Sequence, residues 1–258
     1  MGMDFHSKQN RFSYTTRTAD NSWIQTIKDL VPIKQISNAI DIGCGGGIYS
    51  KALSDMGVAS VTGVDFSKEI LEGAKENCKD YSNISFLQGN AFDTGVVGGS
   101  YDFVLERALI HHIDDLESCF EEAYRILDSD GYLIIQDRTP DDCFVKGSSE
   151  HIRGYFFEHF PKLVEIEAQR RHDSKLIMQT LKAIGFTEME EVTLWETRKV
   201  YENKEALLLE LRERIGRSIL HELTDSELNQ LVHHIDNSIA KESLIVEKDR
   251  WTMWKAVK

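Results

Sequence analysis

The stretch "AIDIGCGGGIYS", residues 39–50, decides the fold. It begins as a short apolar strand, and four of the next five positions, 43–47, are glycine. A strand that turns through a glycine-rich loop into a helix presents backbone N–H groups to a ligand at the helix N-terminus. The stretch therefore predicts a turn that binds a nucleotide or nucleoside, and it leaves open which one.

Short apolar strands alternate with amphipathic helices on both sides of this turn. Alternation at such short intervals is typical of a parallel sheet with helices on both faces. Capping residues such as Ser67 before a helix and Gly185 after one support the boundaries. We expect strands at 38–43, 60–66, 84–90, 101–106 and 131–138, and helices at 19–31, 47–57, 67–78, 114–127 and 173–185.

The pattern changes after Pro140, where residues 141–172 become aromatic and charged. A strand at 186–201 follows, and then a helix at 202–216 whose inward face we assign to Leu208, Leu211 and Ile215. A further helix at 224–240 opens with a capping box. We expect residues 244–257 to form an edge strand.

The spacing of the glycines discriminates between nucleotide classes. The dinucleotide fingerprint G-x-G-x-x-G or -A begins at Gly43 and Gly45, but Ile48 occupies its last position, where a bulky residue packs poorly. No Gly-Lys-Ser/Thr follows, which excludes a P-loop. The spacing that fits is G-x-G-x-G, at Gly43, Gly45 and Gly47.

Two acidic residues point to a cationic nucleoside. Asp41, two residues before the first glycine, would repel a pyrophosphate and attract an ammonium and a sulfonium. Asp65 ends the second predicted strand, where a carboxylate accepts hydrogen bonds from ribose hydroxyls. Asp65 would do so in a dinucleotide site too, so it indicates an adenosine and not the chemistry.

At this point the chain resembles the class I S-adenosylmethionine-dependent methyltransferases, with the quinone-biosynthesis C-methyltransferases as the most similar branch. Four segments carry the resemblance in order: "IDIGCGGGIYS", "GVDFSKEILEGAK", "ISFLQGNAFD" and the stretch from "YDFVLE" to "LIIQD". It covers residues 36–138. It implies an α/β fold with a Rossmann-like, mostly parallel seven-stranded sheet, helices on both faces and an antiparallel last strand.

The resemblance also implies an organisation and a cofactor, S-adenosyl-L-methionine. We expect one domain over residues 1–258, with a cofactor-binding core at 36–138 and accessory insertions at 141–172 and 203–240. Asn90 stands where the family more often has Asp, and Glu106 stands where many relatives have a neutral residue. The implied cofactor-binding residues are Asp41, Gly43, Cys44, Gly45, Gly47, Asp65, Phe66, Asn90, Ala91 and Glu106, with Tyr14 and Arg17 in a segment that often folds over the cofactor.

Catalytic residues are poorly marked, because methyl transfer from a sulfonium needs mainly positioning and a dry site. His111 follows the fourth strand and is the candidate general base, although packing explains it equally well. His112 is better explained as part of the fold, with Asp114 capping the next helix. In "SSEHIRGYFFEHFPKL", residues 148–163, the residues Arg153, Tyr155, Phe156, His159 and Phe160 either close an apolar substrate pocket or pack an accessory helix.

The composition of the chain excludes some classes of binding partner. The net charge of −13 argues against nucleic acid, and the four dispersed cysteines indicate reduced thiols with no metal site. No apolar run is long enough for a membrane span, and the N-terminal residues are polar. We therefore expect a cytoplasmic monomer or homodimer that methylates a small-molecule acceptor. The alternatives are a protein of the same fold that binds the cofactor for regulation, decarboxylation or aminopropyl transfer, and a nicotinamide-dependent dehydrogenase, which Asp41 and Ile48 disfavour.

Overall fold

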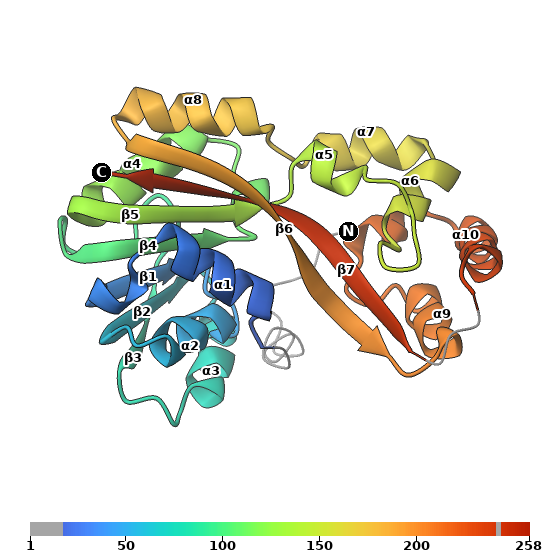
Figure 1. The fold of residues 1–258 in the computed structure, drawn as a ribbon, viewed down its shortest axis with the longest axis horizontal. Helices are drawn as coiled ribbons and strands as arrows, with labels where there is room; N and C mark the ends of the chain where they lie inside the picture. The colour runs from blue at the N-terminus through green and yellow to red at the C-terminus, as the bar shows by residue number, and fades with distance from the viewer. Residues whose placement is uncertain (1–17, 241–243) are drawn as a thin grey trace. The chain divides into compact units, whose positions relative to one another are not determined.

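The computed structural model describes residues 18–240 and 244–258. Its centre is a seven-stranded sheet in the order β3-β2-β1-β4-β5-β7-β6 (Figure 1). Strands β1 to β5 run parallel to one another, and β7 runs antiparallel to β5. The strands are β1 Asn38–Ile42, β2 Ser60–Asp65, β3 Ile84–Gln88, β4 Tyr101–Arg107, β5 Leu127–Asp137, β6 Thr187–Tyr201 and β7 Ile245–Val257. The predicted fold class is confirmed.

Four helices begin at a capping side chain. Asp20, Ser67, Asp173 and Thr224 each accept a hydrogen bond from a backbone N–H of the first turn of their helix. The α-helices are α1 Asn21–Leu30, α2 Ile48–Asp55, α3 Lys68–Asn77, α4 Leu116–Ile126, α5 Pro140–Cys143, α6 Gly154–His159, α7 Lys162–Ala168, α8 Ser174–Ile184, α9 Lys204–Arg212 and α10 Asp225–Ser238; the 3₁₀ turns are η2 Ile33–Gln35, η3 Ile110–His112 and η4 Ser218–Glu222.

Strand order decides which helices cover which face. The chain moves outward from β1 to β2 to β3, then returns to β4 and moves the other way to β5. Since parallel crossovers are right-handed, α2 and α3 cover one face, and α4 covers the other together with α8 (Figure 1). Side chains of β1, β4, β5, α4 and α8 form one buried core around Phe120, Leu133 and Trp254.

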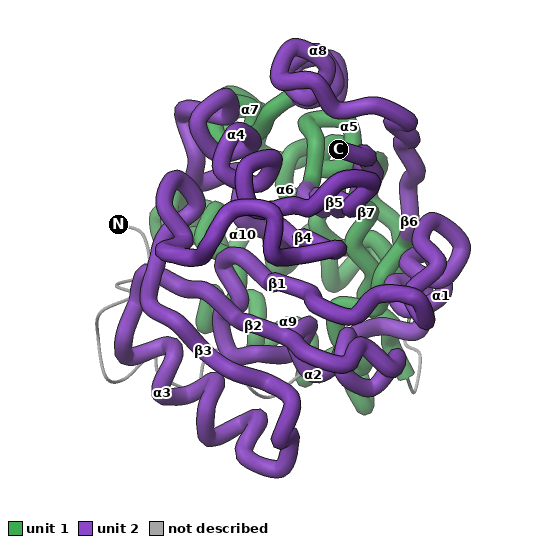
Figure 2. The backbone as a smooth tube through the Cα atoms, turned by 90° about the vertical axis from the view of Figure 1, so that its left-hand side faces the viewer, with its two compact units in different colours: residues 1–3, 138–172, 195–251 green, residues 4–137, 173–194, 252–258 purple. Residues whose placement is uncertain are grey.

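The chain divides into two compact units, coloured separately in Figure 2. Among the described residues, unit 2 comprises 18–137, 173–194 and 252–258 and holds β1 to β5. Unit 1 comprises 138–172, 195–240 and 244–251, and it has its own core around Phe156, Leu211 and Ile235. Both expected insertions lie in unit 1, and the single-domain interpretation stays a prediction.

Three expectations about individual elements were wrong. The last strand, β7, is not an edge strand, because it lies between β5 and β6. Ile215 does not share the inward face of Leu208 and Leu211, because α9 ends at Arg212 and Ile215 is 50% exposed. Asp115, not Asp114, caps α4, where its carboxylate accepts from the backbone N–H of Ser118 at 3.1 Å.

Candidate cofactor-binding site

The predicted site residues of unit 2 meet at the carboxyl ends of β1 and β4. The chain leaves β1 towards β2 and leaves β4 towards β5, so the two connections diverge and the strand order reverses between them. Ligands of open α/β sheets bind at such a switch point. The glycine loop follows β1, and the segment with His111 follows β4.

The glycine loop requires glycine at the three alternate positions that the sequence singles out. Gly43, Gly45 and Gly47 have φ of +73°, +53° and +77°, a left-handed conformation that costs other residues energy. The backbone N–H groups of Gly43 and Cys44 both donate to the carbonyl of Val64, at 2.8 and 3.0 Å. These bonds hold the loop against the end of β2.

The same loop is closely packed from behind. A Cβ added at Gly47 would lie 2.7 Å from the Cys78 Sγ, and one at Gly43 would lie 2.9 Å from a methyl carbon of Leu109. Cys44 is itself buried, and its Sγ would lie 2.9 Å from a Cβ at Gly63. The loop is thus fixed by contacts from α3, β2 and the segment after β4.

Asp41 is a buried carboxylate inside β1, beneath the loop. Ser50 in the first turn of α2 donates its hydroxyl to Asp41 at 2.7 Å, which ties the strand to the helix across the loop. The pKa of Asp41 is raised to about 6, mainly by burial; the hydrogen bond from Ser50 opposes the increase, the nearby carboxylate of Asp65 adds to it, and Arg107 opposes it. A cation bound at the loop would lower the pKa of Asp41 and favour its charged form.

Asp65 lies at the end of β2 and faces the loop. Its carboxylate accepts from the backbone N–H of Gly45 at 3.1 Å and from that of Ser67 at 2.9 Å. Burial raises its pKa, and these backbone donors oppose the increase. An ionised carboxylate has about four acceptor positions, so Asp65 retains capacity for a ribose hydroxyl. Phe66 beside it is 47% exposed and offers an aromatic ring to an adenine.

The predicted adenine-edge residues follow β3. The Asn90 Oδ1 accepts from the backbone N–H groups of Phe92 and Asp93, at 2.8 and 3.0 Å, and so closes a tight turn. These bonds use its carbonyl oxygen, and Ala91 next to it is buried. The structure therefore gives Asn90 a local structural role, and its contact with an adenine stays a prediction.

Glu106 is placed differently from the other acidic residues of the site. It is fully buried at the end of β4, and its two carboxylate oxygens lie 3.6 and 3.7 Å from the thiol of Cys119 in α4. Burial raises the pKa of Glu106 to about 8. The resemblance places Glu106 near the sulfonium, and that role stays a prediction.

Arg107, the last residue of β4, was not singled out from the sequence. Its guanidinium stacks on the ring of Tyr49 in α2, 4.1 Å from the centroid, and its Nε donates to the side chain of Gln136 at 2.9 Å. Ala108 follows with a φ of +51°, which is unusual for a residue with a Cβ. Backbone strain of this kind clusters at functional sites. Ala108 lies where the chain turns from the end of β4 into the segment that carries His111.

His111 lies on the 3₁₀ turn that follows. Its Nδ1 is 2.8 Å from the carboxylate of Asp137 at the end of β5, and the same oxygen accepts the backbone N–H of His111. Asp137 is buried, whereas the His111 side chain is 19% exposed. The ring of His112 packs against that of His111 with centroids 4.0 Å apart. A buried carboxylate thus orients His111 so that Nε2 is the nitrogen left for chemistry.

The side chains present fit S-adenosylmethionine. Its ammonium and sulfonium suit the buried carboxylates beside the glycine loop, and its ribose hydroxyls suit Asp65. Tyr14 and Arg17 lie outside the described residues. Within the described residues, no group of three or more His, Cys, Asp or Glu is placed to hold a metal ion. In residues 18–240 and 244–258, no helix has the length and apolar character needed to cross a membrane.

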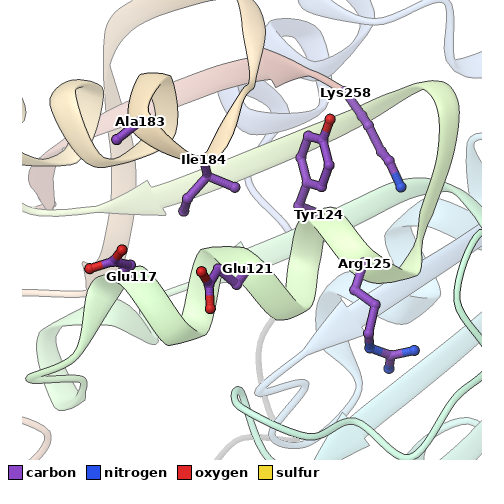
Figure 3. A pocket seen from close by; sticks show the side chains of 7 residues that line it. All are labelled: Glu117, Glu121, Tyr124, Arg125, Ala183, Ile184 and Lys258. Carbon is purple, nitrogen blue, oxygen red and sulfur yellow. The ribbon is translucent and has the colours of Figure 1, made fainter.

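A cavity of about 580 Å³ lies elsewhere in unit 2, along α4 (Figure 3). Tyr124 of α4 and Ile184 of α8 form part of its wall, and Lys258 stacks over the Tyr124 ring at 4.7 Å. Its charged residues, Glu117, Glu121, Arg125 and Lys258, are mixed in sign. The cavity contains none of the predicted site residues.

Comparison with known proteins agrees with this geometry. Residues 40–135 match a family model described as a methyltransferase domain. The demethylmenaquinone methyltransferase of Bacillus licheniformis is 24% identical over 124 residues, covering 47% of this chain and 53% of that protein. The enzyme of the same name from Staphylococcus carnosus is 30% identical over 114 residues, covering 43% and 47%. The chain thus spans about half the length of the curated relatives that it matches.

Solved structures share the fold at low identity. A putative methyltransferase from an antibiotic biosynthesis pathway of Anabaena variabilis has a TM-score of 0.68 at 20% identity and covers 93% of this chain and 98% of that chain. Phosphoethanolamine N-methyltransferase 2 of Haemonchus contortus, in complex with S-adenosyl-L-methionine, has a TM-score of 0.61 at 22% identity and covers 100% and 60%. Residues 40–135 thus match a methyltransferase domain family, and the chain shares its fold with these methyltransferase structures.

Proposed function

We propose that the protein transfers the methyl group of S-adenosylmethionine to a small-molecule acceptor. The observation that carries the proposal is the pair of buried carboxylates, Asp41 and Asp65, on either side of a G-x-G-x-G loop at the switch point. The relatives support a small acceptor, since demethylmenaquinone and phosphoethanolamine appear in their names.

The cofactor, when bound, supplies an activated methyl group, so the protein has to position the reactants and exclude water. Asp65 would hold the ribose, and the loop of Gly43, Gly45 and Gly47 would lie along the methionine end. Asp41, tied to Ser50, would provide the negative field that a cationic ligand favours. Phe66 and Asn90 would flank the adenine.

Calorimetry with S-adenosylmethionine, S-adenosylhomocysteine and NAD tests the proposal. We expect the two sulfur nucleosides to bind and NAD to show no binding, because Ile48 breaks the dinucleotide spacing and Asp41 repels a pyrophosphate. Binding of NAD alone would refute the proposal. Binding of both sulfur nucleosides, with no S-adenosylhomocysteine formed across a broad acceptor screen, would favour the regulatory alternative.

We further propose His111 as the general base for an acceptor that must lose a proton. Asp137 would hold the ring in one orientation through its contact with Nδ1. With an acceptor that is turned over, His111→Asn is expected to lower kcat by roughly 10²- to 10⁴-fold and to leave affinity for S-adenosylhomocysteine unchanged. The loss should be smaller at high pH, where the acceptor deprotonates without help.

His112→Asn is the matched control for His111→Asn. The two rings are adjacent, and the proposal gives His112 no part in the proton transfer. Equal kcat losses in the two variants would assign His111 a packing role. A cytoplasmic location and a monomeric or homodimeric state are proposed together with the function. The absence of a nucleic-acid partner is proposed too, and the net charge of −13 supports it.

A further inference from the structure

Asp41 and Asp65 place two buried carboxylates on one face of the sheet, beside the glycine loop. Asp41 is in register with Gly63, so Asp65, two residues further along β2, lies on the same face. The two residues are only 2% and 8% exposed. Neighbouring carboxylates that are removed from water disfavour each other's charge. The pair therefore needs hydrogen-bond donors or a nearby cation before both members can be ionised.

The two carboxylates differ in the donors that they receive. Asp65 accepts from the backbone N–H groups of Gly45 at 3.1 Å and Ser67 at 2.9 Å. Asp41 accepts from the Ser50 hydroxyl at 2.7 Å, and the backbone N–H of Ser50 contributes least to its environment. A backbone N–H favours an ionised carboxylate, whereas a hydroxyl can also accept from a protonated one. Asp41 is therefore the member of the pair that is better suited to hold a proton.

The groups that act on Asp41 come from every element packed around it. They are Ser50 of α2, Asp65 of β2, Arg107 of β4, Cys44 of the loop and Cys78 after α3. Burial is the largest effect and raises the pKa of Asp41 to about 6, in spite of the Ser50 hydrogen bond and Arg107. Burial also raises the pKa of both thiols, so neither adds a charge near neutral pH.

The methionine end of the cofactor carries the positive charge that this pair of carboxylates favours. Its ammonium is present in S-adenosylmethionine and in S-adenosylhomocysteine, whereas 5′-methylthioadenosine has the same adenosine without the amino acid. A cation beside a carboxylate favours the ionised form, and a protonated carboxyl attracts a cation only weakly. Full attraction for the ammonium therefore requires that Asp41 has lost its proton.

We propose that Asp41 holds a proton in the empty site in mildly acidic solution and releases it to solvent on binding of the methionine ammonium, and that it thereby selects ligands that carry this charge. The proposal rests on the cofactor site of the proposed function. The exchange breaks only the O–H bond of the Asp41 carboxyl, and the ionised Asp41 keeps the Ser50 hydroxyl as its donor. Asp41 is then the residue that distinguishes a nucleoside with an amino acid from one without it.

The pH range of the effect follows from the charge of Asp41 in the empty and occupied sites. In the empty site Asp41 is protonated below a pKa of about 6 and ionised above it. In the complex the ammonium lowers its pKa, so Asp41 stays ionised to lower pH. Affinity for S-adenosylhomocysteine should therefore be complete above about pH 7 and about tenfold lower at about pH 5, because one proton has to be displaced.

Calorimetry of the full chain with S-adenosylhomocysteine in two buffers tests the proposal. Phosphate and imidazole differ widely in the heat exchanged when they take up a proton, so a proton released on binding makes the observed enthalpy differ between them. We expect a difference at about pH 6 and none at about pH 8. Equal enthalpies in the two buffers at about pH 6 would overturn the proposal.

5′-Methylthioadenosine is the control ligand, because it keeps the adenosine and lacks the ammonium. We expect its affinity to change little between about pH 5 and about pH 7, and its binding to release no proton. The same pH dependence for both nucleosides would assign the effect to the ribose partner Asp65 and would overturn the role of Asp41.

Two substitutions test the assignment of the proton. Asp41→Asn keeps an acceptor for Ser50 but cannot titrate, so S-adenosylhomocysteine should bind without proton release and without this pH dependence. Ser50→Ala removes the donor to Asp41 and should move the midpoint of the pH dependence upward by about one unit. Asp55→Asn, at an exposed position at the end of α2, is the matched control and should behave as the wild type. Proton release that persists in Asp41→Asn would refute the assignment.

The outcomes separate this inference from the proposed function. If S-adenosylhomocysteine does not bind at any pH at which the protein is folded, the proposed function fails. If it binds with the same affinity across the range and releases no proton, the cofactor site stands and only the proton exchange at Asp41 is refuted.

Discussion

Replacing Glu106 with glutamine is expected to raise the free energy of unfolding by several kcal/mol at about pH 9 and to change it little at about pH 5. Burial raises the pKa of this carboxyl to about 8 from an ordinary 4.5, so the folded state holds its proton where the unfolded state releases it. Each unit of difference corresponds to about 1.4 kcal/mol. The protonated form of Glu106 contributes its full stability below the pKa of the unfolded state, 4.5. This contribution is lost as the pH rises through the pKa of the folded state, about 8.

Chemical denaturation across this pH range measures the effect. Glutamine keeps the shape of Glu106 and an acceptor for the Cys119 thiol, but it carries no charge at any pH. Glu121→Gln, on the exposed surface of α4, is the control and should follow the wild-type curve. If the free energy of unfolding of Glu106→Gln follows the same pH dependence as the wild type, Glu106 is ionised in the folded protein. The predicted increase in its pKa would then be wrong.

Asp65→Ala is expected to weaken the binding of S-adenosylhomocysteine by roughly 10- to 100-fold, or about 1–3 kcal/mol. The substitution removes a charged acceptor for the ribose and also the partner of the Gly45 N–H, which helps to shape the loop. Both effects act in the same direction. Calorimetry with the product is the appropriate measurement, because no acceptor is needed.

Asp65→Asn separates the two effects, since an amide oxygen still accepts from Gly45 but carries no charge. We expect it to lie between the wild type and Asp65→Ala. Asp80→Ala, an exposed acid after α3, is the control and should bind like the wild type. Unchanged affinity in both Asp65 variants would exclude Asp65 from the cofactor site.

Local signals in the sequence were sufficient to predict most of unit 2. A helix cap such as Ser67 acts on a backbone N–H three residues away, and the left-handed turn at Gly43, Gly45 and Gly47 is set by the residues themselves. Apolar periodicity then selects which face of each helix is buried. The seven-stranded sheet followed from these signals together with the family resemblance.

Pairings between distant segments could not be predicted in the same way. Residues 244–257, which carry Glu247 and Asp249, were expected to form an edge strand. Both carboxylates are instead buried against arginines from other elements, Arg217 and Arg138. A single sequence does not reveal that these charges are neutralised by partners 30 and 111 residues away.

The residues of the candidate site also differ in whether a local signal or a distant pairing places them. The sequence points to Asp41, Asp65 and His111 because each lies near the carboxyl end of a predicted strand or in the segment that follows one. Asp137 as the partner of His111 could not be predicted, because it lies 26 residues further along the chain and becomes a neighbour only when β4 pairs with β5.

The position of β7 between β5 and β6 also dictates an order of events during biosynthesis. Its residues 252–257 pair with β5, although β5 is complete more than a hundred residues earlier. Until residue 257 has left the ribosome, the edge of β5 that pairs with β7 has no neighbouring strand. The backbone donors and acceptors along that edge are then open to other chains. Nascent chains stalled before β7 should therefore depend on chaperones, whereas the β1 to β5 half can already have formed.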